Sequence, residues 1–507
     1  MFKSDEYFRM ANYLTKLVDV DPNKAIKLAR KLRKDYIKDT NAKLLAAITM
    51  VDAGPAARQP DAIEEGIALL REIHESHPTE DIMYNLANGL VSAAGYPPAN
   101  ESWLDHQEST KYIRAEAREL FWNTSQKAHN PTLATQALNN LANQFSHSFR
   151  LGEAHDTWRK ALEVEPTNGV AAYCIANNLN WMESFTDCSE LTKIEAATYA
   201  RIALKHKDVV LQFAGLNAAT KMVEFAESFE EPPSRSAHQD PFLLWVEQER
   251  LTLAPTVELV NPELGMIDWL MLPGIFEQEA NIGGLPPPIF GMFNMLKSDF
   301  ILARDLAWRS FDNTQWPATG RFLGTNDYAY YGPNVSALIL AHRTALDLLD
   351  KVAVTANHYF DLNSKPDKVT FGNLWREPNR KDKKLQPLTK KIENIIRQGV
   401  YPLYGLVELA DDYSKSEGIL YSQKQLRNAG THRFVILHEY GDISEYRQAP
   451  EIEHHQIEKF TQEVTKAIRV ARSAIQMLAY SIAKHESCVL KKKTDIIGTL
   501  YLNDQEL

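Results

Sequence analysis

The sequence predicts an all-α protein in which a solenoid of helical repeats precedes a C-terminal helical bundle. Three observations support this prediction. Short similar phrases recur in the N-terminal half of the 507-residue chain, apolar residues in the C-terminal half recur at steps of three and four, and no alternating strand pattern interrupts them. A chain of this length is too long for one hydrophobic core, so we expect two or three domains.

The repeated phrase ends in an apolar residue followed by Ala-Asn. It occupies residues 84–88, 139–143 and 173–177, and the last two copies lie 34 residues apart. The repeat that begins near Thr135 puts apolar residues on a first helix and small residues with one large aromatic on a second, namely Leu138, Leu141, Ala142 and Phe145, then Ala154, Trp158, Ala161 and the closing Pro166. This period and pattern resemble tetratricopeptide (TPR) repeats, over roughly residues 20–205.

A repeat of this kind cannot bury its apolar face alone and must stack on its neighbours. The resemblance therefore implies a TPR-like helical solenoid with a concave surface, which would bind a protein or peptide partner or trigger. Asn88, Asn143 and Asn177 recur at matching positions of successive first helices. They would either grip the backbone of a ligand or form hydrogen bonds between repeats.

Two clusters of helix-breaking residues divide the rest of the chain. They are Glu230–Ser236, with two prolines, and Gly283–Pro288, with two glycines and three prolines. We therefore expect a TPR-like repeat domain at 1–205, a helical connector and loop at 206–284, a helical bundle at 285–490 and a C-terminal tail at 491–507.

The C-terminal bundle is predicted from four apolar stripes. The first covers residues 293–307, the second Ser336–Val354, and the third lies around 391–409, where Pro402 either kinks the helix or starts a new one. The fourth keeps steps of three and four from Ile457 to Ile482. Stripes of this kind are typical of a four-helix bundle.

The segment Arg427-Asn428-Ala429-Gly430-Thr431-His432 contains the residues best suited to chemistry. It lies between a polar stretch at 411–418, expected to be a loop, and the fourth helix, so we expect a loop–helix junction. Five positions along a helix separate two side chains by about 140°. Arg427 and His432 would therefore converge only if the helix breaks, for which Gly430 is suited, or if two copies of the chain face each other.

An arginine that holds a phosphate and a histidine that transfers protons suit phosphodiester cleavage. RNA supplies its own nucleophile, the 2′-OH, so this chemistry needs no metal. The motif, set among amphipathic helices, resembles the R-x4-6-H motif of HEPN-superfamily ribonucleases. Residues 285–490 are most similar to the LA2681-like HEPN branch, whose fold is also a helical bundle.

This resemblance implies a role for each motif residue. Arg427 would hold the scissile phosphate, His432 would transfer protons, and Asn428 would orient the histidine or the phosphate. HEPN ribonucleases typically form homodimers in which two motifs meet, and they leave a 2′,3′-cyclic phosphate and a 5′-OH. The implied role is that of a toxin-like effector in antiviral defence or stress response, with an RNA substrate for which tRNA is one candidate. Asp347 and Asp350 would either face the motif or lie on a solvated helix surface.

A net charge of −10 does not suit non-specific coating of nucleic acid, so an RNA enzyme needs a local basic patch. The basic stretch 376–397 offers one, and its residues Lys381, Lys383, Lys384, Lys390 and Lys391 are candidate RNA contacts, together with Arg433 beside the motif. The alternative is that the basic stretch is a solvated loop.

Other patterns limit the possible functions. Three scattered cysteines without a CxxC pair, no apolar window of membrane length and a charged N-terminus predict a cytoplasmic protein without disulfides. His438 and His454-His455 do not match a usual zinc spacing, and no P-loop occurs, so neither a metal nor another cofactor is expected. Two alternatives stay open: a non-enzymatic TPR scaffold with a HEPN-like dimerisation or RNA-binding module, and a metal-dependent nuclease.

Overall fold

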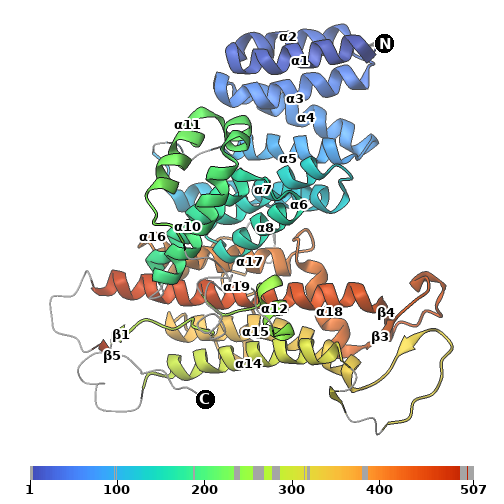
Figure 1. Ribbon diagram of the computed structural model, residues 1–507, viewed down its shortest axis with the longest axis vertical. Coiled ribbons are helices and arrows are strands. Elements are labelled where there is room, and N and C mark those ends of the chain that lie inside the picture. Colours follow the sequence, from blue (N-terminus) through green and yellow to red (C-terminus); the bar gives the residue numbers. More distant parts are fainter. Residues whose placement is uncertain are drawn as a thin grey trace. The chain divides into compact units, whose positions relative to one another are not determined.

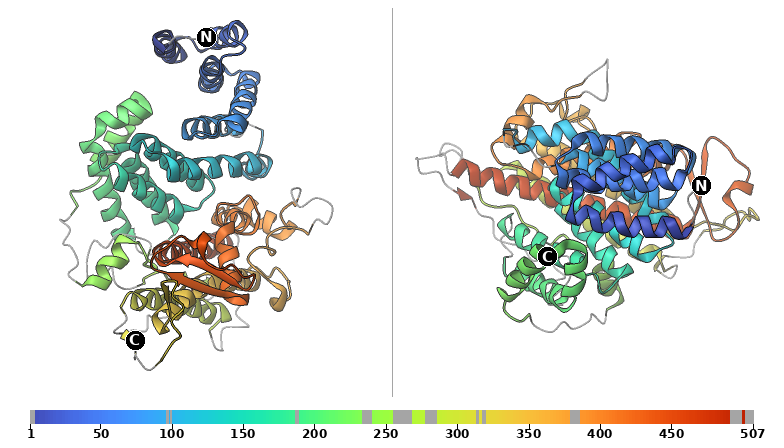
Figure 2. Two further views of the ribbon diagram at one scale, coloured as in Figure 1. Left: turned by 90° about the vertical axis from the view of Figure 1, so that its right-hand side faces the viewer. Right: turned by 90° about the horizontal axis from the view of Figure 1, so that it is seen from above.

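The computed structural model describes residues 4–95, 98, 100–185, 189–232, 240–254, 268–276, 286–312, 315–316, 320–378, 386–490 and 499–500. It divides into two compact units, which Figures 1 and 2 colour along the sequence. Unit 1 comprises Met1–Gln144 with Lys160–Pro166, and unit 2 comprises Phe145–Arg159 with Thr167–Leu507. The all-α prediction is confirmed, because helices account for most of the described residues.

Unit 1 is a succession of helices in which each of α2 to α5 packs against the next along the chain. Figure 1 shows α1 to α5 following one another as a stack. The helices of this unit are α1 (Ser4–Val20), α2 (Pro22–Asp35), α3 (Thr40–Ala57), α4 (Pro60–Ser76), α5 (Glu80–Ala94), α6 (Trp103–Lys127) and most of α7 (Pro131–His147), with the end of α8 (Leu151–Val164).

Local sequence explains how these helices begin and how closely they pack. The Asp21 side chain accepts a hydrogen bond from the backbone N–H of Lys24 at the start of α2, and Asp39 caps α3 in the same way. A Cβ at Gly66 would lie 2.8 Å from Val51 Cγ2, so α4 approaches α3 this closely only because Gly66 has no side chain. Successive packed helices are consistent with a repeat solenoid, and the TPR assignment stays a prediction.

One of the two roles considered for the recurring asparagines is seen in unit 1. The Asn140 side-chain amide donates to Oδ1 of Asn88 at 2.9 Å, which links α7 to α5. Asn177, in unit 2, donates to the Tyr173 carbonyl of its own helix at 3.1 Å. Hydrogen bonding between helices therefore accounts for Asn88.

Unit 2 contains a first group of helices and then the bundle. The first group is α9 (Gly169–Met182), η1 (Glu183–Phe185), α10 (Ser189–Lys205), α11 (Lys207–Glu227) and α12 (Pro241–Gln248). The bundle is formed by α14 (Pro288–Ser310), α15 (Pro333–Tyr359), α16 (Lys390–Arg397), α17 (Pro402–Ser414), α18 (Tyr421–His432) and α19 (Ile457–Leu490), with the short turns η4 (Pro366–Lys368) and η6 (Ile443–Glu445).

The core of the bundle forms where α15 and α17 pack against α19 and α14 packs against α15. Phe300 of α14, Leu349 of α15 and Ile475 of α19 are each fully buried, as the apolar stripes predict. Pro402 does not kink the third helix. It starts a new one, because α16 ends at Arg397 and α17 begins at Pro402.

Unit 2 also contains two small sheets that the sequence did not predict. Strand β2 (Ala329–Tyr330) pairs antiparallel with β3 (Phe434–His438), which pairs parallel with β4 (Ile452–Gln456). Strands β1 (Ile275–Phe276) and β5 (Thr499–Leu500) form the second sheet. Because β3 follows α18 directly, the three-stranded sheet adjoins the Arg427–His432 segment.

Ion pairs within unit 2 join residues 145–159 to the bundle. Arg150 bonds Asp412 of α17 at 2.5 Å, and Arg472 of α19 bonds both carboxylate oxygens of Asp156 at 2.7 Å. The division between the two compact units falls near 145–166, and the domain ranges expected from the sequence stay a prediction. Within the described residues, no helix is long and apolar enough to span a membrane.

Candidate active site

The Arg427–His432 segment forms the last turns of α18, which runs without a break from Tyr421 to His432. Its inner face is formed by the buried side chains of Gln423, Leu426 and Ala429. Of the two alternatives, the helix break for which Gly430 is suited is therefore not seen. A glycine weakens a helix by only about 1 kcal/mol, and packing against α15 outweighs that cost.

Replacing Gly430 by alanine should stabilise the protein by about 0.5–1 kcal/mol, because alanine is the better helix former. A Cβ at this position would meet Cδ of Arg343 at 3.5 Å and Cγ2 of Ile339 at 3.6 Å, which are ordinary contacts. Gly399 has a φ of 103°, so Gly399→Ala should destabilise and serves as the contrast. Urea unfolding measures both, and a destabilised Gly430→Ala variant would contradict a continuous helix.

The polar stretch 411–418, expected to be a loop, is helical over its first half. Helix α17 continues to Ser414 because long-range ion pairs hold its acidic residues: Arg376 bonds Asp411 at 2.9 Å and Arg150 bonds Asp412. The motif itself lies within the next helix, α18, and not at a loop–helix junction. Arg376, counted in the predicted basic patch, is 9% exposed and so is mostly removed from the surface.

Arg427 is held by two carboxylates from α15. Its Nε donates to Oδ1 of Asp347 at 2.8 Å, and its Nη2 donates to Oδ2 of Asp350 at 2.8 Å. Nη2 also lies 2.7 Å from Oδ1 of Asp347. Of the two roles considered for Asp347 and Asp350, the structure therefore shows the one in which they face the motif.

This contact fixes the charge state and orientation of Arg427. Burial opposes the charge on the guanidinium, but Tyr413, Asp350 and Asp347 together raise the pKa of Arg427, so it stays charged. The net charge of Arg427, Asp347 and Asp350 is −1 when all three side chains are ionised. The edge formed by Nε and Nη2 is occupied by the aspartates, which leaves Nη1 as the nitrogen best placed to meet a substrate phosphate.

Tyr413 adds a hydroxyl next to Arg427 that the sequence analysis missed. The side chain is 3% exposed, and its hydroxyl interacts with Arg427. Burial raises the pKa of Tyr413 to about 12, although the neighbouring Arg427 lowers it, so the hydroxyl keeps its proton at neutral pH. Tyr413 could not be identified from the sequence because it lies in the stretch expected to be a loop.

His432 and Asn428 face solvent. Both are exposed, and neither side chain makes a hydrogen bond or ion pair within the described part of the chain. His432 lies five positions after Arg427 on a continuous helix, so one copy of α18 directs the two side chains about 140° apart. A single chain therefore does not bring Arg427 and His432 to one point.

A buried polar contact fixes α18 against its neighbours. The Gln423 Oε1 atom lies 2.9 Å from Nε2 of His342 on α15, and the Gln423 amide bonds Glu463 of α19. Burial lowers the pKa of His342 to about 4, so the imidazole is neutral at neutral pH and its Nε2 donates this hydrogen bond. The sequence analysis did not single out His342, because a histidine on an apolar helix face carries no distinguishing pattern.

The candidate RNA contacts are not gathered around the motif. Arg433 forms an ion pair with Glu453 of β4, and Lys391 bonds Asp361 at 2.9 Å, while Lys390 is exposed at the start of α16. Figure 1 places α16 and α18 apart within unit 2. Lys381, Lys383 and Lys384 lie outside the described residues.

The three histidines considered as metal ligands lie in the small sheet. Nε2 of His438 lies 2.8 Å from Nδ1 of His454, and Tyr446 stacks on the His438 ring at 4.2 Å between centroids. His455 contacts Glu453 instead, with His455 Nε2 3.4 Å from a Glu453 carboxylate oxygen. No group of three or more His, Cys, Asp or Glu suited to a metal ion occurs among the described residues. The expectation of a metal-free site stays a prediction.

The arrangement is that of a helical bundle whose penultimate helix presents an R-x4-H motif, with the arginine braced by two aspartates. Residues 282–485 match the family described as LA2681-like HEPN. The match covers α14 to α18, most of α19 and the three-stranded sheet, so it contains the whole candidate site. A search of curated proteins gave no match for the chain.

Proposed function

We propose that the chain is a metal-independent endoribonuclease of HEPN type, controlled by its N-terminal repeats. The single observation that best supports this is the geometry of Arg427, an arginine oriented by two carboxylates on a helix that also presents an exposed histidine. The family match at residues 282–485 supports the same class of chemistry. The repeats would dock a partner or trigger, and the physiological role would be a toxin-like effector in antiviral defence or stress response.

The proposed reaction is an internal transesterification of RNA, with tRNA as one candidate substrate. The 2′-oxygen forms a bond to phosphorus, the bond from phosphorus to the 5′-oxygen breaks, and a proton passes from the 2′-OH to the departing 5′-oxygen. His432 transfers this proton, and Nη1 of Arg427 stabilises the developing charge on the phosphate. Asn428, exposed on the same helix, orients the phosphate or the imidazole.

A dimer completes this site. Arg427 and His432 could meet through a break in the helix or across two copies of the chain. Because α18 is continuous, its fold favours the second arrangement. The surface beside His432 suits such a contact, because Phe434, two residues further on, is 71% exposed. Arg427 of one copy would then work with His432 of the other.

Mixing two inactive variants tests this proposal. Arg427→Ala and His432→Ala chains are each expected to lack cleavage, whereas a refolded mixture should recover roughly a quarter of wild-type activity or more, since mixed dimers carry one complete Arg–His pair. The readout is cleavage of a labelled RNA in EDTA. Activity in neither the mixture nor the wild type would contradict the enzyme, and active wild type with an inactive mixture would contradict the shared site.

A second function is favoured by one specific observation. Asp347 and Asp350 already occupy one edge of the Arg427 guanidinium, and the three groups together are negative, which weakens attraction for phosphate. This suits a non-enzymatic TPR scaffold whose HEPN-like bundle serves for dimerisation or RNA binding. Wild-type chains that dimerise and bind RNA without cutting it would select this function.

A further inference from the structure

Helix α2 presents a stripe of lysines that the proposed active site does not use. Residues 22–38 contain seven lysines and arginines and one aspartate, a net charge of +6 within a chain of net charge −10. Lys24, Lys27, Lys31 and Lys34 recur at steps of three and four, which puts them within about 80° of one another around the helix axis. Lys38, in the turn after α2, continues the pattern. We call these five residues the lysine stripe.

The lysine stripe is exposed and strongly basic. All five side chains are exposed, and none makes an ion pair or a side-chain hydrogen bond among the described residues. Like charges three or four positions apart destabilise a helix, and Asp35 is the one acidic residue between Lys24 and Lys38. Repulsion between these lysines destabilises α2, and no ion pair of the lysine stripe offsets it among the described residues. Such a surface is a candidate for function.

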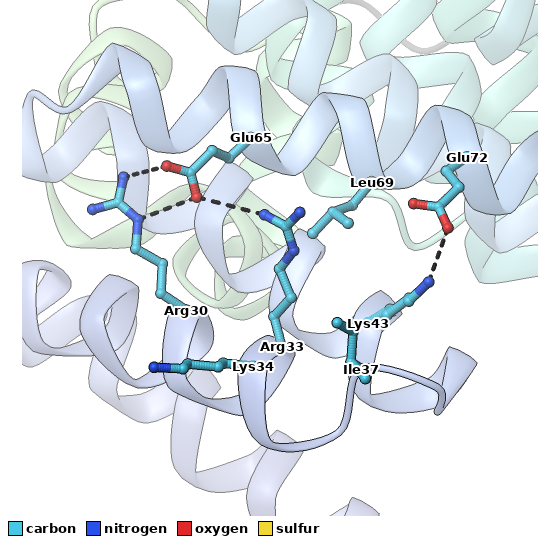
Figure 3. Close-up of a pocket in the computed structure, with 8 residues that line it drawn as sticks. All are labelled: Arg30, Arg33, Lys34, Ile37, Lys43, Glu65, Leu69 and Glu72. Atoms are coloured by element: carbon cyan, nitrogen blue, oxygen red, sulfur yellow. Dashed lines mark hydrogen bonds and ion pairs between the residues drawn. The ribbon is translucent and has the colours of Figure 1, made fainter.

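The neighbouring cations of α2 and α3 differ from the lysine stripe in being paired. Arg30 bonds Glu65 at 2.8 Å, Lys43 bonds Glu72 at 2.8 Å, and Arg33 lies 4.0 Å from the same Glu65. Figure 3 shows these contacts around a pocket between α2 and α4, and no dashed line reaches Lys34. Carboxylates of α4 therefore pair with Arg30, Arg33 and Lys43, whereas Lys34, which lines the same pocket, makes no ion pair among the described residues.

We propose that the lysine stripe is a docking surface for the phosphate backbone of single-stranded RNA. Successive lysines are about 5 Å apart along α2, so a row of regularly spaced phosphates can meet them in turn. The choice of RNA rests on the proposed function, because the substrate of the bundle would be the ligand of the repeats. Lysine contacts to phosphate carry no base information, so this docking is independent of sequence.

Two other classes of partner fit less well. An amphipathic helix that binds a membrane inserts its apolar face, but Ala25, Ile26, Ala29 and Leu32 of α2 are buried within unit 1. A protein partner usually requires aromatic or aliphatic anchors at the centre of its interface, and the lysine stripe contains none. Binding of phosphate groups requires only the positive charges of the lysines.

The test measures binding of full-length protein to a fluorescent 2′-O-methyl oligonucleotide, which has no 2′-OH and cannot be cleaved by the proposed reaction. The variant replaces Lys24, Lys27, Lys31 and Lys34 by glutamine, which preserves helix propensity. The matched control replaces four exposed lysines elsewhere, Lys205, Lys207, Lys221 and Lys365, and so makes the same change in net charge.

We expect the stripe variant to lose at least 10-fold in affinity at low salt, and the slope of log K against log salt to fall by about 3, from four contacts with a single strand. The control should lose less than 2-fold. Equal effects in the two variants would overturn the proposal. The proposal would also be overturned if the stripe variant kept its RNA affinity but lost binding to phosphatidylserine vesicles or to polyglutamate. The partner would then be a membrane or an acidic protein.

A cleavage assay with unmodified RNA separates this inference from the proposed function. If both hold, the stripe variant raises KM and leaves kcat unchanged, because the lysine stripe contributes no residue to the proposed chemistry. Stripe-dependent binding without any wild-type cleavage would overturn the enzyme and leave the docking surface supported. Cleavage with unchanged KM and unchanged binding in the stripe variant would overturn the docking surface alone.

Discussion

Replacing His432 by alanine is expected to reduce RNA cleavage by about 100-fold to 10,000-fold, the range that a positioned general acid or base contributes. The same change should alter the free energy of unfolding by less than about 0.5 kcal/mol, because the side chain is exposed and makes no bond within the described residues. Initial rates with labelled RNA and a urea unfolding curve measure the two effects.

His358 provides the matched control for this variant. It too is an exposed histidine in the last turn of a helix, α15, and it lies outside the proposed machinery. His358→Ala should retain wild-type cleavage. Equal rates for His432→Ala and wild type would remove His432 from the mechanism, and an equal loss in both variants would point to a general effect of losing a surface histidine.

Removing the Asp156 carboxylate should cost about 3–5 kcal/mol of stability, the largest effect that we expect from a single substitution. The Asp156 carboxylate accepts two hydrogen bonds from Arg472, whose side chain is fully buried, and one from Arg250 at 3.0 Å. Asp156→Ala removes the carboxylate that pairs with both buried guanidinium groups. The loss comes from this uncompensated charge more than from the bond itself.

Urea unfolding at neutral pH measures this loss, and Asp305→Ala is the control. Asp305 pairs with Arg309 on the surface, where both side chains are more than a third exposed, so its loss should cost less than about 1 kcal/mol. Similar costs in the two variants would mean that the Asp156 cluster does not hold residues 145–159 to the bundle.

The same carboxylate predicts a dependence of stability on pH. Burial alone would raise the pKa of Asp156, but Arg472, Arg250 and Arg469 lower it to about 2, below its usual value of 3.8. The folded state therefore binds this proton less readily than the unfolded state. The contribution, about 2 kcal/mol, is fully present above about pH 4 and is lost as the pH falls towards 2. In Asp156→Ala, this part of the acid dependence should be absent.

The bundle helices could be predicted because their apolar residues repeat. Phe300, Leu349 and Ile475 belong to stripes with helical spacing, and each is buried. The first half of the 411–418 stretch could not be assigned correctly, because Asp411 and Asp412 are helical and pair with arginines 35 and 262 residues away. Ion pairs of that range leave no trace in local composition.

The residues of the candidate site were chosen from the sequence, and their geometry could not be predicted from it. Arg427 and His432 stand out by type and spacing, but the helix through Gly430 depends on its contact with α15, which no local pattern encodes. Asp347 and Asp350 on α15 could be named as possible partners of Arg427. The sequence could not decide between that role and a solvated helix surface, because charged residues on a helix show the same pattern in both cases. The strands β3 and β4 are only five residues long, too short for an alternating pattern to stand out.

The most direct test of the proposed ribonuclease is the chemistry of its products. Wild-type protein and His432→Ala are incubated with total RNA in EDTA, and the ends of the fragments are identified by phosphatase and kinase treatment. The proposed mechanism predicts discrete fragments with a 2′,3′-cyclic phosphate and a 5′-OH, from wild type only. Fragments with a 3′-OH and a 5′-phosphate, or cleavage that appears only when a divalent metal is added, would contradict it.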